Sequence, residues 1–83
     1  MSAPRPLHVR FFAVLREQAG CAAVELDSAA PTPAALYAEL RRRHALTFPA
    51  ELLKVAVNER YADMDTPLAA GDRVVFIPPV AGG

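Results

Sequence analysis

Hydrophobic and polar residues alternate along several short stretches, and this period of two predicts β-strands that each bury one face. Residues 7–11 read Leu-His-Val-Arg-Phe, and the apolar residues 12–14 are expected to continue that strand. A helical turn over 15–19 would end at Gly20, because glycine adopts left-handed backbone angles without steric cost. Residues 22–26 then predict a second strand.

The next stretch changes to a helical period. Thr32 is a suitable N-cap, and Pro33 suits the first helical position, where its missing N–H costs nothing. Leu36, Leu40 and His44 follow at intervals of four residues and form one stripe. The pattern predicts an amphipathic helix of about three turns.

Short strands return in the C-terminal half. Residues 53–57 alternate again, a turn at 58–59 precedes a brief strand over 60–62, and the polar loop 63–70 has Leu68 as its apolar anchor. Residues 73–77 are apolar on both faces, which predicts a central strand.

The predicted order is β-β-α-β-β-β, with one main helix. One helix covers only one face of a four- to five-stranded sheet, so the other face is open to water or to a partner. If the first and last strands are neighbours, they run parallel and the sheet is mixed. This is the ubiquitin-like β-grasp arrangement of the α+β class. We expect a single domain over residues 1–83, with a loose leader at 1–6 and an extended tail at 78–83.

Composition narrows the function. The 83 residues contain 9 Lys+Arg and 9 Asp+Glu, and a zero net charge argues against nucleic-acid or anionic-membrane binding driven by counterion release. A chain of this length builds one thin core, too small for a large enclosed substrate pocket. No stretch predicts a signal peptide or a membrane span, so a cytoplasmic protein is expected.

Side chains that could carry chemistry are few. His8 and His44 lack the spacing of a metal site, so no metal is expected. The lone Cys21 has no cationic residue within four positions that would activate it, and it cannot form an internal disulfide. Residues 41–43 are arginines near a helix end, where they suit the helix dipole.

The C-terminus is the most informative segment. Pro78 and Pro79 favour extended backbone after the last strand, and small apolar residues follow them. The final pair, Gly82 and Gly83, has no side chains, so it fits a narrow channel with its backbone against the walls. The terminal carboxylate would then be the delivered group.

A carboxylate is a poor electrophile, and it is most simply activated as an acyl-adenylate made from ATP. A sulfur nucleophile that displaces AMP would leave a thiocarboxylate, which can carry sulfur. The chain has no Gly-rich phosphate loop. We therefore expect no cofactor bound by the chain itself, and ATP used by an activating partner.

Four motifs give the chain a family resemblance, and they run from near the first strand to the last residue. They are Val9-Arg10-Phe11-Phe12-Ala13 with Arg16-Glu17 and Gly20; Val55-Ala56-Val57-Asn58; Leu68-x-x-Gly71-Asp72-x-Val74; and Phe76-Ile77-Pro78-Pro79-Val80-Ala81-Gly82-Gly83. In these the chain resembles the family of small, sulfur-carrying subunits of molybdopterin synthase.

The resemblance implies that a ubiquitin-activating-type enzyme adenylates Gly83, which becomes a thiocarboxylate. The tail would enter the large subunit of molybdopterin synthase, in a heterotetramer, and give its sulfur to a cyclic pterin precursor of the molybdenum cofactor. The large subunit would supply the catalytic acids and bases.

The open sheet face is the expected docking surface. Phe12, Tyr61 and Ile77 are candidate apolar anchors, and Arg16 is a candidate polar contact, since aromatic residues and arginine dominate interface energies. Core packing is the alternative for Phe12 and Ile77. The other predicted partner-binding residues belong to the tail: Pro78, Pro79, Val80, Ala81 and Gly82.

Three other functions stay open at this point. A sister carrier would serve thiamin, cysteine or tRNA thiolation with the same chemistry. A ubiquitin-like modifier would be joined through Gly83 to lysines of target proteins. A β-grasp interaction domain would have an inert tail.

Overall fold

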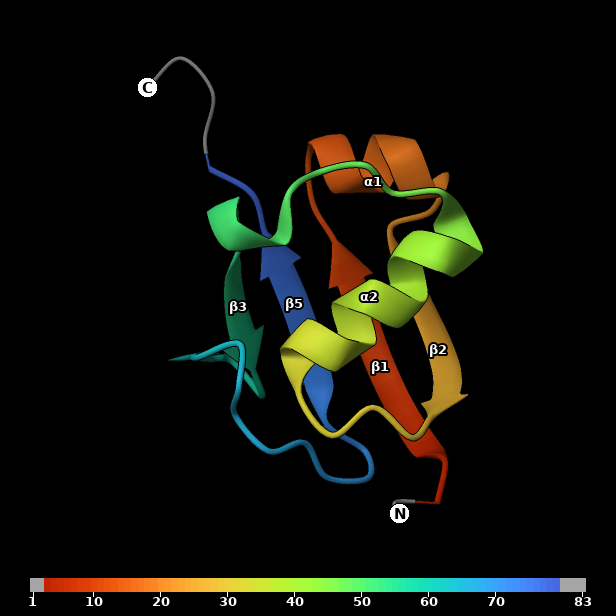
Figure 1. Cartoon of the computed structure of the whole chain (residues 1–83), viewed down its shortest axis with the longest axis vertical. Helices are drawn as coiled ribbons and strands as arrows, with labels where there is room; N and C mark the ends of the chain where they lie inside the picture. Colours follow the sequence, from red (N-terminus) through yellow and green to blue (C-terminus); the bar gives the residue numbers. More distant parts are fainter. Residues whose placement is uncertain (1–2, 80–83) are drawn as a thin grey trace.

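One helix crosses one face of a mixed, five-stranded sheet (Figure 1). The computed structural model describes residues 3–79. In chain order the elements are β1 (Arg5–Phe11), α1 (Val14–Ala19), β2 (Ala23–Ser28), α2 (Pro33–His44), the 3₁₀ helix η1 (Ala50–Leu52), β3 (Lys54–Val57), β4 (Arg60–Ala62) and β5 (Arg73–Ile77). The α+β, ubiquitin-like β-grasp prediction is confirmed.

The strand order β2-β1-β5-β3-β4 places the last strand at the centre of the sheet. β5 runs parallel to β1 and antiparallel to β3, and β2 and β4 are antiparallel edge strands. The predicted central position of β5 is confirmed, and because β5 does lie beside β1, the two strands run parallel, as expected for neighbours.

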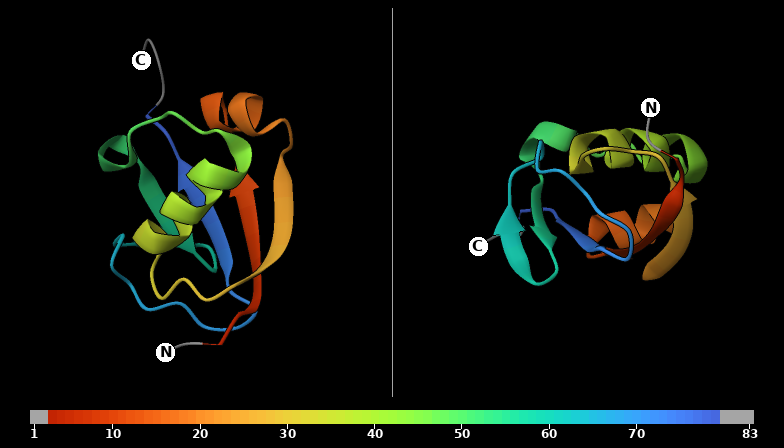
Figure 2. Two further views of the ribbon diagram at one scale, coloured as in Figure 1. Left: turned by 45° about the vertical axis from the view of Figure 1, so that its right-hand side comes forward. Right: turned by 90° about the horizontal axis from the view of Figure 1, so that it is seen from below.

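The core lies between α2 and the sheet, as seen from below in Figure 2. Alternate residues of the three inner strands point into it and are almost fully buried: Leu7, Val9 and Phe11 of β1, Val74 and Phe76 of β5, and Val55 of β3. From α2, Leu36, Tyr37 and Leu40 complete the layer. The Tyr37 and Phe76 rings meet with their centroids 5.2 Å apart.

The ends of α2 follow the sequence signals. The Thr32 hydroxyl accepts a hydrogen bond from the Ala35 amide at 3.3 Å, and Pro33 opens the helix. Tyr37, in the middle of α2, donates a hydrogen bond from its hydroxyl to the carbonyl of Phe48, beyond the helix, at 2.8 Å. Burial raises the pKa of Tyr37, although the nearby charge of Arg41 acts to lower it.

The expected leader over residues 1–6 is wrong in its boundary. Arg5 and Pro6 already belong to β1, where they pair with Ser28 and Asp27. The Arg5 guanidinium also donates to the carbonyls of Ser28 at 2.6 Å and Leu68 at 3.0 Å. Partners far along the chain therefore extend both β1 and β2 beyond their predicted ends.

The first strand ends earlier than the apolar run 12–14 suggested. Ala13 has φ 51°, outside the range of a strand, and α1 begins at Val14. Leu15 of this helix is fully buried, and Gly20 ends the helix with φ 77° as predicted. The 3₁₀ helix η1 was not predicted.

No helix within residues 3–79 combines the length and the apolar character that crossing a membrane requires.

Candidate functional site

The tail leaves the sheet at the end of β5. Within the described residues, Pro78 is buried against its own domain and Pro79 is exposed. A partner-binding role for Pro78 is therefore not supported by its exposure, whereas Pro79 is accessible. Val80, Ala81, Gly82 and Gly83 lie outside the described residues, and their proposed roles stay predictions.

The face of the sheet opposite α2 carries no helix among residues 3–79 (Figure 2). The strand register shows which residues lie side by side across this face. One row across the strands contains Tyr61, Ala56, Val75, Arg10 and Ala23, in the order β4-β3-β5-β1-β2. The row nearest the tail contains Lys54 beside Ile77. We call this surface the open face.

The predicted apolar anchors lie on or beside the open face. Tyr61 is 78% exposed and Phe12 is 46% exposed, whereas Phe11, which precedes Phe12, and Phe76, which precedes Ile77, are buried in the core. Ile77 is half-buried. Because Phe11 pairs with Phe76 on parallel strands, Phe12 and Ile77 reach the same level, at the end of the sheet where Pro78 follows. The core alternative for Phe12 is excluded by its exposure.

Arg16 and Leu52 are also exposed near this end of the sheet. Arg16 lies on α1, which follows β1 directly, and its side chain is exposed. Leu52 on η1 is 56% exposed and was missed by the sequence analysis, because nothing in its local pattern indicates a 3₁₀ helix.

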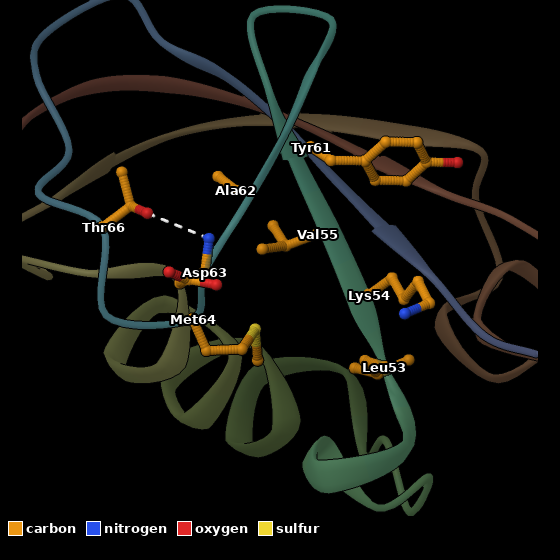
Figure 3. Close-up of a pocket in the computed structure, with 8 residues that line it drawn as sticks. All are labelled: Leu53, Lys54, Val55, Tyr61, Ala62, Asp63, Met64 and Thr66. Atoms are coloured by element: carbon orange, nitrogen blue, oxygen red, sulfur yellow. Dashed lines mark hydrogen bonds between the residues drawn. The ribbon is translucent and has the colours of Figure 1, made fainter.

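A groove opens where β4 separates from β3 after Ala62 (Figure 3). Val55, Ala62 and Met64 point to its helix side, whereas Tyr61 and Lys54 point to the side of the open face. The groove therefore adjoins the open face along its β4 edge.

Cys21 and His44, which the sequence offered as a possible nucleophile and a possible metal ligand, both pack against the domain. Cys21 is partly buried against the core. The His44 ring packs edge-on against Phe11, with centroids 5.8 Å apart. Among residues 3–79, no group of three or more His, Cys, Asp or Glu side chains is placed to hold a metal ion.

Comparison with known proteins assigns the chain to a family. The ThiS family model matches residues 9–83. The molybdopterin synthase sulfur carrier subunit of Escherichia coli is 40% identical over 80 residues, covering 93% of this chain and 99% of the relative. The chain belongs to the ThiS family.

Solved structures of similar proteins agree with the β-grasp fold. Small archaeal modifier protein 1 from Haloferax volcanii matches with a TM-score of 0.78 and 27% identity, covering 94% of this chain and 99% of that chain. A chain in the complex of subunits 1 and 2 of molybdopterin-converting factor from Helicobacter pylori matches with a TM-score of 0.66 and 26% identity, over 94% of this chain and 99% of that chain.

Two of the motifs that gave the resemblance to sulfur-carrying subunits of molybdopterin synthase contain residues with a structural role. The Asn58 amide donates to Asp72 Oδ1 at 2.9 Å, and its oxygen accepts from the Arg73 amide at 2.9 Å. The second Asp72 oxygen accepts from the Ala69 amide at 2.7 Å. Asn58 and Asp72 thus tie the β3–β4 turn to the start of β5, which positions the strand that carries the tail.

Proposed function

We propose that this ThiS-family protein is the sulfur carrier subunit of a molybdopterin synthase. The observation that carries the proposal is the combination of a Gly82-Gly83 end with an exposed apolar surface at the end of the sheet where the tail begins. The body would dock through Phe12, Tyr61 and Ile77, and the tail would present its terminal carboxylate to the partner.

The reagent is the carboxylate of Gly83. A ubiquitin-activating-type partner joins one carboxylate oxygen to the α-phosphorus of ATP, and pyrophosphate leaves. A hydrosulfide equivalent then attacks the carbonyl carbon and displaces AMP, which leaves a thiocarboxylate. Its sulfur is transferred to a cyclic pterin precursor in the large subunit, whose side chains supply the acids and bases. Adenylation requires ATP, which is abundant in the cytoplasm. We therefore propose that the protein acts in the cytoplasm.

The length of the tail limits the geometry of transfer. Four residues follow Pro79, and four residues span at most about 14 Å when fully extended. The partner's active site must therefore lie within that distance of Pro79. This requires docking close to Phe12 and Ile77, with one tail entering each large subunit of the heterotetramer that we propose.

Mass spectrometry tests the proposal directly. The full chain is incubated with ATP, Mg²⁺, sulfide and the adenylating enzyme encoded in the same genome. We expect the mass increase of one oxygen replaced by sulfur, and sulfur transfer to the pterin precursor when the large subunit is added. Deletion of Gly83 should abolish both reactions without changing the thermal unfolding midpoint, because the core ends before the tail. Full activity of the deletion variant would refute the proposal.

The likeness to a small archaeal modifier protein favours a second candidate, a ubiquitin-like modifier joined through Gly83 to lysines. It would share the adenylation step. Lysine-linked adducts across many cell proteins, with no sulfur transfer to the pterin precursor, would favour the modifier.

A further inference from the structure

We propose that the open face selects its partner by charge: it takes a protein surface whose apolar centre is bordered by carboxylates facing Arg10, Lys54 and Arg73. The inference rests on the proposed function, because the partner it describes is the surface that receives the tail. These three cations would determine which partner surface is recognised and in which orientation it docks.

The register places cations directly beside the apolar residues. Arg10 is paired with Val75, and Lys54 is paired with Ile77. Side chains paired across neighbouring strands on one face lie about 5 Å apart. A partner that covers Val75 and Ile77 therefore also covers the stems of Arg10 and Lys54, and brings its own border within range of both charges.

These cations have little compensation within the domain. Neither Arg10 nor Lys54 forms an ion pair among residues 3–79. Arg73 has only a long contact of 3.7 Å with Glu59, and both side chains are mostly exposed. Such an exposed pair contributes little to stability, so Arg73 is available to a partner.

Two acidic residues of the open face lie on its outer strand β2, whereas Glu59 lies beside Arg73 at the β3–β4 turn. The β1–β2 register puts Glu25 opposite His8 and Asp27 opposite Pro6, so both carboxylates belong to the outer strand β2. The Glu25 carboxylate already contacts His8 Nδ1 at 3.0 Å. The face is therefore basic along β1, β5 and β3 and acidic along β2, and this polarity fixes how a partner with an acidic border is oriented.

Because the chain has zero net charge, the attraction between the open-face cations and a partner's carboxylates acts only at short range. With 9 basic and 9 acidic residues, the whole molecule does not steer an acidic partner from a distance. Exposed charges are screened beyond about 10 Å at 0.1 M salt. The local cluster of cations acts within that distance, where charge complementarity steers the last stage of the encounter, which raises the association rate, and rejects wrong partners.

The test measures association of the full chain with the molybdopterin synthase large subunit of the same genome, by stopped flow, over about 0.05 to 0.5 M NaCl. We expect Arg10→Glu and Lys54→Glu each to lower the association rate roughly tenfold at the lowest salt, with the difference from wild type shrinking as salt rises. Arg10→Gln and Lys54→Gln should give intermediate rates.

Arg42→Glu is the matched control, because Arg42 is exposed on α2, which packs on the opposite face of the sheet. It makes the same charge change and should leave the rate close to wild type. Circular dichroism and the thermal midpoint verify that each variant is folded, which is expected since Arg10 and Lys54 are exposed.

Wild-type binding that is insensitive to salt, or an Arg42→Glu effect equal to that of the open-face reversals, would overturn the inference and leave the sulfur-carrier function intact. No wild-type association at any salt concentration would overturn the inference together with the large-subunit partner. Failure of the carrier function itself would be recognised separately, by the absence of the thiocarboxylate mass.

Discussion

The two faces of β5 differ although the strand is apolar throughout. Val74 and Phe76 have no exposed surface and pack beneath α2. Val75 and Ile77, which alternate with them, are only half-buried on the open face. One strand thus provides fully buried core residues and, one position apart, the half-buried residues that would contact a partner under the proposed function. Stability and partner binding should therefore be separable by substitutions at adjacent positions.

The largest effect that would test this difference is on stability. Phe76→Ala should lower the free energy of unfolding by about 3–5 kcal/mol, because it removes a ring that contacts Tyr37. A small domain has only about 5–15 kcal/mol in total. Urea unfolding followed by circular dichroism measures the loss.

Ile77→Ala is the matched variant on the other face of the same strand. It should cost less than about 2 kcal/mol and should weaken binding to the large subunit by tenfold or more, as expected of an interface anchor. Equal destabilisation by the two variants would contradict the separation of core and docking face.

A smaller effect is expected where Asn58 and Asp72 hold the start of β5. Asn58 has φ 53°, and glycine adopts that conformation freely, so Asn58→Gly removes the side-chain hydrogen bonds without backbone strain. We expect a loss of about 1–2 kcal/mol in the free energy of unfolding, measured by thermal denaturation.

The adjacent residue provides the control for that variant. Glu59 has φ 72° and forms only the long contact with Arg73, so Glu59→Gly should raise the stability or leave it unchanged. If both glycine variants lose the same stability, the hydrogen bonds of Asn58 are not what fixes the corner.

The smallest effect concerns pH. Burial raises the pKa of Tyr37 above its ordinary value of 10.0, so the unfolded chain releases this proton first. Stability should therefore fall as the pH rises above 10.0 toward the pKa of the folded state. Tyr37→Phe should remove this part of the fall and, at neutral pH, cost about 1 kcal/mol for the lost hydrogen bond. An unchanged alkaline slope in Tyr37→Phe would exclude Tyr37 as its source.

Local patterns predicted most of the fold. The strand over 73–77, the short strand over 60–62 and the helix after Thr32 were predicted correctly, because alternation and capping are encoded by neighbouring residues. The errors involve partners distant in sequence. Arg5 joins β1 through Ser28 and Leu68, and a pattern read along the chain carries no record of such contacts.

Some residues of the candidate site were likewise singled out from the sequence, and others were not. Residue type made Phe12 and Tyr61 candidate anchors, but only the structure shows that both side chains are exposed. Lys54 and Arg10 were not singled out, because each is an ordinary polar position of its own strand. Only the strand register shows that both border one apolar surface.

The central place of β5 also has a consequence for synthesis. The sheet cannot close around β1 until the final strand has been made, since β5 fills the gap between β1 and β3. Pairing across so much of the chain is slow to form compared with local contacts. A nascent or prematurely terminated chain therefore lacks the folded sheet, so under the proposed function only finished molecules would present a C-terminus to an activating partner.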